Sequence, residues 1–295
     1  MACFVRRVGA AVSVTGSAAP AIDEMQARQP CRVPPTGKLM RQESELVLSL
    51  RRSKSRAGRR CPALALALVL VLVLPFSGAA LARPAIVELY TSEGCSSCPP
   101  AEQLIEKLST RADVLPLAFH VDYWDGLGWR DRFSMQEATQ RQQQFAHHLQ
   151  LSTVGTPQFI VEGRAAVWGA NPRELAKALE KPRSDVPVLV ERQRSFIVVH
   201  SPAQAITAPY EVYVIGYLPK AVTAIGRGEN AGHTLTEVNV VRYAHRIGLS
   251  GGSSQSWSVP LNALPRDATR LIVLLQAQSD GAILGASEIE ELDRS

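Results

Sequence analysis

Two cysteines two residues apart carry the strongest chemical signal in this 295-residue chain. The segment reads Cys95-Ser-Ser-Cys98-Pro-Pro and lies where an apolar stretch expected to form a strand, 85–90, gives way to an expected helix, 99–111. Two thiols at this spacing can close a tight disulfide. A thiolate at the N-terminus of a helix is stabilised by the helix dipole, which lowers its pKa and makes it reactive. The pattern therefore indicates thiol–disulfide chemistry.

A CxxC pair can also supply half of a zinc site, since zinc takes about four ligands. The sequence has no second CxxC, and the histidines His120, His147 and His148 lie at no recognisable ligand spacing. An inert stabilising disulfide is a further alternative, but a bridge over so short a loop restrains the unfolded chain little. A redox-active pair is favoured, and Cu(I) held by Cys95, Cys98 and His120 is the metal-binding alternative.

The first 82 residues have the features of a targeting extension. They hold 12 Lys/Arg and 4 Asp/Glu, a net charge of +8, whereas the remainder holds 20 and 23, a net charge of −3. The body of the protein therefore offers no electrostatic case for binding nucleic acid.

Basic residues within 51–60, the apolar run 63–74 and Ala80-Leu-Ala82 predict a signal peptide. We therefore expect a periplasmic or secreted bacterial protein that contacts the membrane only transiently, through this peptide. An uncleaved anchor is the alternative, although the run is short for a membrane span. We also expect translation to start at Met40, which leaves residues 1–39 untranslated. Cleavage would leave a mature chain whose two cysteines are Cys95 and Cys98.

The remaining chain divides into two patterns. Within 83–182 the expected order is β-α-β-α-β-β-α, which is typical of a central sheet with helices on both faces. The expected strands are 85–90, 114–121, 158–162 and 165–168, and the expected helices are 99–111, 134–149 and 172–180. From residue 186 to 292 seven further strands predict an all-β sandwich-like domain, at 186–191, 195–200, 210–218, 235–246, 254–259, 270–278 and 282–289.

Thr156-Pro157 is the second motif with chemical meaning. Its proline precedes the expected strand 158–162 and removes a backbone donor, which is typical of an edge or a special turn; by residue type alone the bond is expected to be trans. With the CxxC about 60 residues earlier, the sequence resembles the thioredoxin fold. That resemblance implies that Cys95 is an exposed nucleophile and Cys98 the resolving thiol. It also implies that Pro157 is cis and lies against the disulfide, and that Thr156 offers backbone hydrogen bonds to an extended peptide.

Four segments resemble one uncharacterised bacterial family more narrowly. They are Glu88-Leu-Tyr-Thr-Ser-Glu-Gly-Cys-Ser-Ser-Cys-Pro-Pro-Ala101, His120-Val-Asp-Tyr-Trp-Asp125, Gly155-Thr-Pro-Gln158 and Gly226-Arg-Gly-Glu-Asn-Ala-Gly232. The family is domain of unknown function 1223, whose members are predicted to be secreted and thioredoxin-like. The resemblance spans most of residues 84–290 and brings no known reaction with it. It implies a thioredoxin-like α/β domain followed by the all-β domain.

One departure from thioredoxins concerns the buried acid that they keep six residues before the first cysteine as a proton relay. Leu89 occupies that position here, and Glu88 points to the other face of the strand. We take Asp122, after the expected strand 114–121, as the substitute, although an aspartate there is also typical of a turn. The dipeptide between the cysteines is Ser-Ser rather than Gly-Pro, so the direction of electron flow stays open.

Two loops are open to more than one interpretation. The aromatic loop 122–131 is expected to plug the rim of the core rather than to form a peptide groove. The glycine-rich segment 226–233 lacks the Lys-Ser/Thr of a phosphate loop, and hairpin geometry is favoured over a contact with the CxxC.

We therefore expect an exported thiol–disulfide oxidoreductase that acts on protein or small thiols, with a redox partner and without a cofactor. Its predicted site consists of Cys95, Cys98, Thr156, Pro157 and Asp122. The alternatives are a periplasmic Cu(I)-binding protein and a thioredoxin-like binding module without catalysis, since fold does not imply function.

Overall fold

The computed structural model describes residues 83–200, 206, 208–251 and 254–292. The predicted signal peptide and the Met40 start lie outside the described residues. The elements in chain order are β1 (Ala85–Thr91), α2 (Pro99–Ser109), β2 (Val114–His120), α3 (Gln136–His148), β3 (Gln158–Val161), β4 (Ala165–Trp168), α4 (Pro172–Leu179), β5 (Leu189–Arg192), β6 (Phe196–His200), β7 (Tyr210–Ala224), β8 (Thr234–Ser250), β9 (Ser256–Pro260), a 3₁₀ turn (Leu261–Ala263), β10 (Arg270–Ala277) and β11 (Ile283–Ile289).

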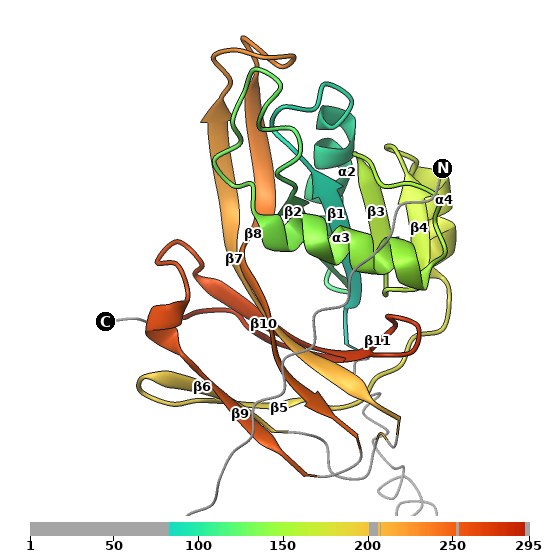
Figure 1. The fold of residues 1–295 in the computed structure, drawn as a ribbon, viewed down its shortest axis with the longest axis vertical. Coiled ribbons are helices and arrows are strands. Elements are labelled where there is room, and N and C mark those ends of the chain that lie inside the picture. The colour runs from blue at the N-terminus through green and yellow to red at the C-terminus, as the bar shows by residue number, and fades with distance from the viewer. Residues whose placement is uncertain (1–82, 201–205, 207, 252–253, 293–295) are drawn as a thin grey trace, which may run out of the picture. The chain divides into compact units, whose positions relative to one another are not determined.

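One mixed sheet of eight strands runs through most of the described chain, in the order β11-β10-β7-β8-β2-β1-β3-β4 (Figure 1). β1 and β2 are parallel, as are β2 and β8, and the other neighbours are antiparallel. The junction between the two halves is narrow, with Ala118 of β2 paired to Val240 of β8. β5, β6 and β9 form a separate three-stranded antiparallel sheet.

This continuous sheet overturns the expected fold class. The strands and helices predicted from the sequence are present, but they do not form a thioredoxin-like α/β domain followed by a separate all-β sandwich-like domain. The protein is mostly β: β7 and β8 are 15 and 17 residues long and extend beyond the strands expected there, and Val240 of β8 pairs with Ala118 of β2, which joins the two expected domains in one sheet. The expected strand 210–218 stopped before Pro219, yet β7 continues, with Leu218 opposite Val240 and Lys220 opposite Val238.

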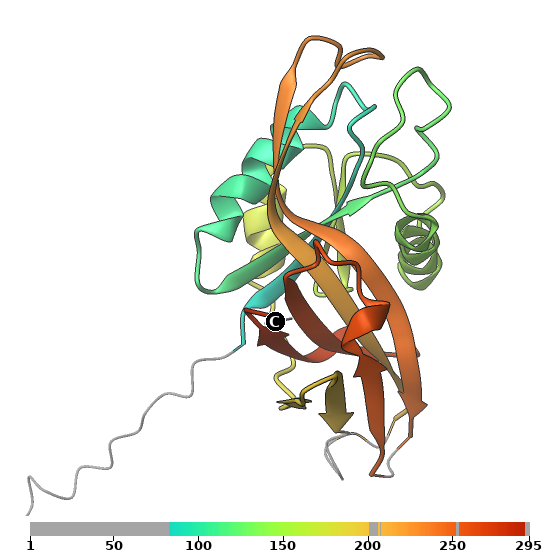
Figure 2. The ribbon, with the colours of Figure 1, turned by 90° about the vertical axis from the view of Figure 1, so that its left-hand side faces the viewer.

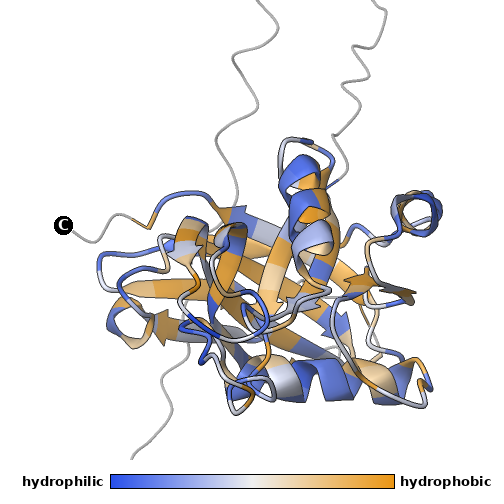
Figure 3. Ribbon diagram, turned by 90° about the horizontal axis from the view of Figure 1, so that it is seen from above, coloured by the Kyte–Doolittle hydropathy of each residue, from blue (hydrophilic) through white to orange (hydrophobic). Residues whose placement is uncertain are grey.

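The strands nearest the cysteines have both faces buried, because helices cover both sides of this half of the sheet (Figure 2). Alternate residues of β1 point to opposite faces. Ile86 and Tyr90 lie in the cluster that includes Phe145 of α3, whereas Val87 and Leu89 lie in the cluster that includes Ile105 of α2 and Leu175 of α4. Figure 3 shows apolar residues concentrated on the strands and hydrophilic residues on the outer sides of the helices. This packing fixes the end of β1, where the CxxC begins.

The other half of the sheet packs against the three-stranded sheet. Ile197 and Val199 of β6 join Val212 and Val214 of β7 and Val273 of β10 in one apolar cluster. In the described part of the chain, no helix has the length and apolarity needed to cross a membrane.

Candidate functional site around the Cys95–Cys98 disulfide

Cys95 and Cys98 form a disulfide at the turn from β1 to α2, with their Cα atoms 5.4 Å apart. Cys98 is the N-cap residue of α2, and Pro99 and Pro100 occupy the first two helical positions. Prolines favour the start of a helix, but each lacks an N–H group. The two first amides of α2 are therefore not available to stabilise a thiolate, and the helix dipole acts on the pair without them.

Both cysteines are buried, with exposed fractions of 0% for Cys95 and 1% for Cys98. The exposed Cys95 implied by the thioredoxin resemblance is therefore wrong for the disulfide form. Ser96 and Ser97 between them are exposed, and the Ser97 hydroxyl lies 3.3 Å from Cys95 Sγ. A thiol that attacks the disulfide in this arrangement has to displace part of its cover.

That cover includes the turn between β7 and β8, residues 225–233, here called the hairpin tip. The side chain of Asn230 is buried and donates from Nδ2 to the backbone oxygens of Glu93 (2.9 Å) and Cys95 (3.0 Å). The Glu229 carboxylate accepts from the Ser96 hydroxyl (2.7 Å) and backbone N–H (3.3 Å), which lowers the pKa of Glu229. The tip is a hairpin turn, as the sequence favoured, and it also holds the CxxC, an alternative that had been ranked lower.

Glycines allow the tip to approach the aromatic loop. Gly228 and Gly232 have φ values of +83° and +82°, in the left-handed region that favours glycine. A Cβ atom on Gly228 would lie 3.0 Å from the Cβ of Trp129. The indole N–H of Trp129 in turn donates to the Glu93 carboxylate at 2.7 Å. The hairpin tip is thus packed against the loop after β2 as well as against the CxxC.

Thr156 and Pro157 lie beside the same end of β1. β3 pairs antiparallel with β1, with Gln158 opposite Tyr90, and the Thr156–Pro157 peptide bond is cis, as the resemblance implied. Trp124 contacts both this loop and the CxxC loop. Its indole N–H donates to Thr156 Oγ1 at 2.8 Å. Its Cβ atom packs against Gly94, where an added Cβ atom would be 3.5 Å away. Trp124 is thus packed between the two motifs, as expected for a residue that plugs the rim of the core.

Asp122, predicted as a substitute proton relay, is engaged elsewhere. Its carboxylate accepts a hydrogen bond from the Thr139 hydroxyl at 2.6 Å. The backbone N–H of Asp122 donates to that hydroxyl oxygen of Thr139 at 3.2 Å. Among the contacts of the described residues, none links Asp122 to either cysteine. Asp122 therefore ties the end of β2 to α3, in the turn-forming role that the sequence also allowed.

A group of buried ionisable residues that the sequence reasoning largely missed includes one residue of the CxxC loop and one of α2. We call it the buried acid cluster, and its members are Glu93, Glu102, His120, Asp131 and Glu237. Each is between 0% and 5% exposed. They come from the CxxC loop, α2, β2, the loop after β2, and β8, so both halves of the sheet contribute.

His120 and Asp131 are the tightly bonded part of this cluster. His120 Nδ1 donates to Asp131 Oδ2 at 2.7 Å, and the backbone N–H groups of Glu93 and Phe133 each donate to the same carboxylate at 2.8 Å. Burial lowers the pKa of His120, but the carboxylates of Asp131, Glu237 and Glu102 outweigh burial and raise this pKa to about 10. Burial likewise opposes ionisation of Asp131, but His120 outweighs it and lowers the Asp131 pKa. The pair is therefore ionised at neutral pH.

The pKa values of Glu237 and Glu102 are shifted in the other direction. Burial raises the pKa of Glu237 to about 8 and raises that of Glu102, although His120 opposes both shifts. Glu237 Oε1 lies 3.8 Å from His120 Nε2, too far for a hydrogen bond. The buried polar atoms without a hydrogen-bond partner among the described residues include both carboxyl oxygens of Glu102, Oε1 of Glu93, Nε2 of His120 and Oγ1 of Thr91. At neutral pH Glu237 therefore keeps a proton within the cluster.

The sequence held weak signals for these residues. Glu102 follows Cys98 by four positions on the apolar side of α2, next to the buried Ala101 and Ile105, which is unusual for a charged residue. Glu237 lies within β8 on the same side as the buried Leu235. Neither signal shows which distant element each carboxylate meets.

The predicted metal alternative brought together Cys95, Cys98 and His120. His120 instead uses Nδ1 for Asp131, while its Nε2 faces Glu237. Within the described ranges, no group of three or more His, Cys, Asp or Glu side chains is arranged to hold a metal ion.

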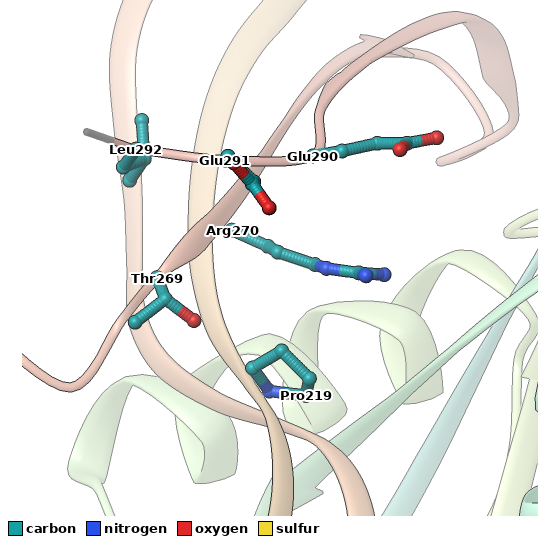
Figure 4. A pocket seen from close by; sticks show the side chains of 6 residues that line it. All are labelled: Pro219, Thr269, Arg270, Glu290, Glu291 and Leu292. Carbon is teal, nitrogen blue, oxygen red and sulfur yellow. The ribbon is translucent and has the colours of Figure 1, made fainter.

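A shallow cavity of about 390 Å³ opens elsewhere, where β7, β10 and the end of β11 meet (Figure 4). Its lining residues are Pro219, Thr269, Arg270, Glu290, Glu291 and Leu292. None of the cysteine-site residues lines it, so it contributes nothing to the chemistry of the disulfide.

Comparison with known proteins places the chain in a family. The family model described as "Protein of unknown function (DUF1223)" matches residues 86–276. The chain belongs to this family. The matched part of this DUF1223 protein contains both cysteines, the hairpin tip and the whole buried acid cluster, and the family description names no reaction.

A solved structure similar to this DUF1223 protein is the crystal structure of a protein from Agrobacterium tumefaciens. The two are 29% identical over 72% of this chain and 97% of that chain, with a TM-score of 0.61. Two β-glucosidase structures match far less well. The Kluyveromyces marxianus enzyme in complex with glucose is 12% identical over 36% of this chain and 13% of that chain, with a TM-score of 0.18. The Thermotoga neapolitana enzyme 3B in complex with glycerol is 14% identical over 36% of this chain and 15% of that chain, with a TM-score of 0.15, and TM-scores this low do not establish a shared fold. No curated protein matches the chain.

Proposed function

We propose that this DUF1223 protein is an exported thiol–disulfide oxidoreductase that acts through Cys95 and Cys98 on protein or small thiols. The observation that carries the proposal is the placement of the disulfide at the start of α2, with the Thr156–Pro157 loop held beside the same turn by Trp124. The export part rests on the sequence of residues 51–82 alone.

In the proposed reaction a substrate thiolate attacks Cys95 Sγ, the Cys95–Cys98 bond breaks, and Cys98 leaves as a thiolate. A second substrate thiolate then attacks the substrate sulfur of the mixed disulfide and releases Cys95. Two electrons pass from the substrate dithiol to the cysteine pair, and two protons follow them. The reverse sequence reduces a substrate disulfide, and the direction depends on the reduction potential of the pair.

Access to the disulfide is the step that the geometry makes demanding. The Asn230 and Glu229 contacts with the CxxC loop must loosen before a thiolate can approach a fully buried sulfur. Glu229 and Ser96 are exposed, so their hydrogen bond competes with water and is the weaker of the two contacts. The hairpin tip is therefore the proposed gate to the site.

The same burial favours a second candidate, a binding module whose disulfide is not used. In that case the Cys95–Cys98 bond would stay oxidised against every physiological thiol. The measured reduction potential separates the two candidates, because a pair poised for exchange lies between about −120 and −270 mV, whereas structural disulfides lie below about −300 mV.

The proposal predicts that Cys95→Ser abolishes dithiothreitol-driven reduction of insulin by the protein, because the variant has no Cys95 thiolate to attack the insulin disulfide. Cys98→Ser should instead accumulate a mixed disulfide with substrate, visible as a mass increase that dithiothreitol removes. Undiminished insulin reduction by the Cys95→Ser variant would contradict the proposed function.

A further inference from the structure

Glu102 is the carboxylate most directly tied to the resolving cysteine. Its backbone N–H donates to the carbonyl oxygen of Cys98 at 3.1 Å, the hydrogen bond that joins residues four apart in a helix. Side chains four residues apart lie on the same face of a helix, one above the other. Cys98 has helical backbone angles and is 1% exposed, and Glu102 is 5% exposed, so both side chains enter the same buried space.

The Thr91 hydroxyl faces the Glu102 carboxyl group and lowers its pKa against the larger effect of burial. No group among the described residues lies within hydrogen-bond distance of either Glu102 oxygen, although both oxygens are buried. Buried carboxyl groups are otherwise almost always bonded, because leaving one without a partner costs about 1–3 kcal/mol or more. Stability alone therefore does not account for a glutamate at this position of α2.

The groups around Glu102 come from every element packed against it. β1 contributes Thr91, the CxxC loop Glu93, β2 His120, the following loop Asp131, and β8 Glu237. Arg132 is a further cation beside the cluster, with its Nε 3.8 Å from Glu93 Oε1, and its side chain is about half exposed. Since negative groups outnumber positive ones, a proton shared among the carboxylates is favoured over full ionisation.

Reduction of the disulfide needs a proton in this space. When the bond breaks, Cys98 is left as a buried thiolate. Pro99 and Pro100 have no N–H groups, so the first two positions of α2 cannot donate a hydrogen bond to this thiolate. Asp122 is bonded to Thr139 and is linked to neither cysteine. Glu102, one helical turn from Cys98, remains the group placed to serve this thiolate.

We propose that Glu102 gives its proton to Cys98 when the disulfide is reduced and takes it back when the disulfide re-forms. This assignment rests on the proposed function and deepens it. On reduction by a dithiol, the Cys95–Cys98 bond breaks, the Glu102 carboxyl group becomes a carboxylate, and Cys98 becomes a neutral thiol. On oxidation the Glu102 carboxylate accepts the Cys98 proton as the thiolate attacks the mixed disulfide on Cys95.

The test measures the rate of reduction of Cys95–Cys98 by dithiothreitol between pH 5 and 9, at reagent concentrations where the rate is proportional to dithiothreitol. Glu102→Gln keeps the size of the side chain but cannot transfer the proton. Its rate should fall about tenfold or more below wild type at low pH, and the ratio should approach one as pH rises. Glu102→Asp should recover part of the loss. Glu106→Gln, an exposed position on the same helix, should follow wild type at every pH.

Equal rates and equal pH profiles for wild type, Glu102→Gln and Glu106→Gln would overturn the role of Glu102 and leave the proposed function standing. A Glu102→Gln rate that is low by the same factor at every pH would also overturn it, because that result indicates a structural effect. If dithiothreitol reduction depends on Glu102 as predicted but wild type exchanges neither with insulin nor with glutathione, the proposed function fails and the proton assignment stands.

Discussion

Two groups of buried ionisable side chains in the described residues balance their charges differently. Glu88 and Arg141 form a complete pair, joined at 2.6 and 2.7 Å, with the Tyr90 hydroxyl donating to the same carboxylate. In the buried acid cluster, by contrast, carboxylates outnumber cations and several oxygens lack partners. The Glu88–Arg141 pair thus holds β1 to α3, whereas the cluster remains able to exchange protons.

The cluster predicts a dependence of stability on pH. The pKa of Glu237 is about 8 in the folded protein and that of His120 about 10, both above their ordinary values. The folded state therefore binds these protons more tightly than the unfolded state. The stability that Glu237 contributes is full below about pH 4.5 and is lost as pH rises through 8, and that of His120 is full below about pH 6.5 and is lost as pH rises through 10.

We expect the free energy of unfolding, measured by urea titration, to fall from pH 5 to pH 9. Glu237→Gln should make this fall smaller between pH 5 and 8 by at least about 1 kcal/mol, because one pKa unit corresponds to about 1.4 kcal/mol. The exposed Glu180→Gln should leave the profile unchanged. A stability that rises across this range in wild type would contradict the assigned protonation states.

Among the elements, the β7–β8 hairpin has the greatest influence on the site. Its tip covers the disulfide through Asn230, and β8 carries Glu237 into the buried acid cluster. The hairpin also joins β2 in the sheet, so movement of the tip relative to β1 is limited by the strands that carry it. Opening of the site is therefore expected to involve the tip itself rather than the whole hairpin.

Asn230→Ala tests this cover. The substitution removes the two hydrogen bonds to the carbonyl oxygens of Glu93 and Cys95, which together hold the tip closed by about 1–3 kcal/mol. Reduction of the disulfide by dithiothreitol should then be about five- to a hundredfold faster than in wild type. Arg227→Ala, at an exposed position of the same tip, serves as the matched control. An unchanged rate in Asn230→Ala would show that the tip does not limit access.

The sequence predicted the elements far better than their pairing. β1, α2 and β4 were expected within two residues of their limits, because periodicity and proline positions are local properties. The expected strands 210–218 and 235–246 were too short, since no local rule indicates that β7 passes through Pro219. The contact between Ala118 and Val240 joins residues more than a hundred positions apart, and only the folded chain reveals it.

The same distinction applies to the candidate site. Cys95, Cys98 and Pro157 were found because their spacing is itself the signal. The roles of Glu102, Asn230 and Glu237 become visible only once distant elements meet. Asp122 was assigned to the relay because Leu89 occupies the usual position and Glu88 points to the other face of the strand.

At the scale of the whole molecule, the sheet makes the two halves of the described chain interdependent. The half with the helices and the half with the three-stranded sheet share β7 and β8, and the buried acid cluster draws residues from both. Elements that share one sheet and a buried cluster are expected to unfold together.

We therefore predict one cooperative unfolding transition in urea. Trp257→Phe removes the tryptophan of β9, so the remaining fluorescence reports only on residues between 124 and 168. In this variant the fluorescence transition should coincide with the far-UV circular dichroism transition, which follows all strands. Two separated transitions, or a plateau between them, would contradict a single unit.

Asn230 follows Cys95 by 135 positions in the chain. During synthesis the two thiols therefore leave the ribosome long before the residues that will enclose them, and contacts between such distant residues form late in folding. We therefore expect the two thiols to be accessible to oxidants until the hairpin packs on the CxxC loop, and completion of the fold to end that access.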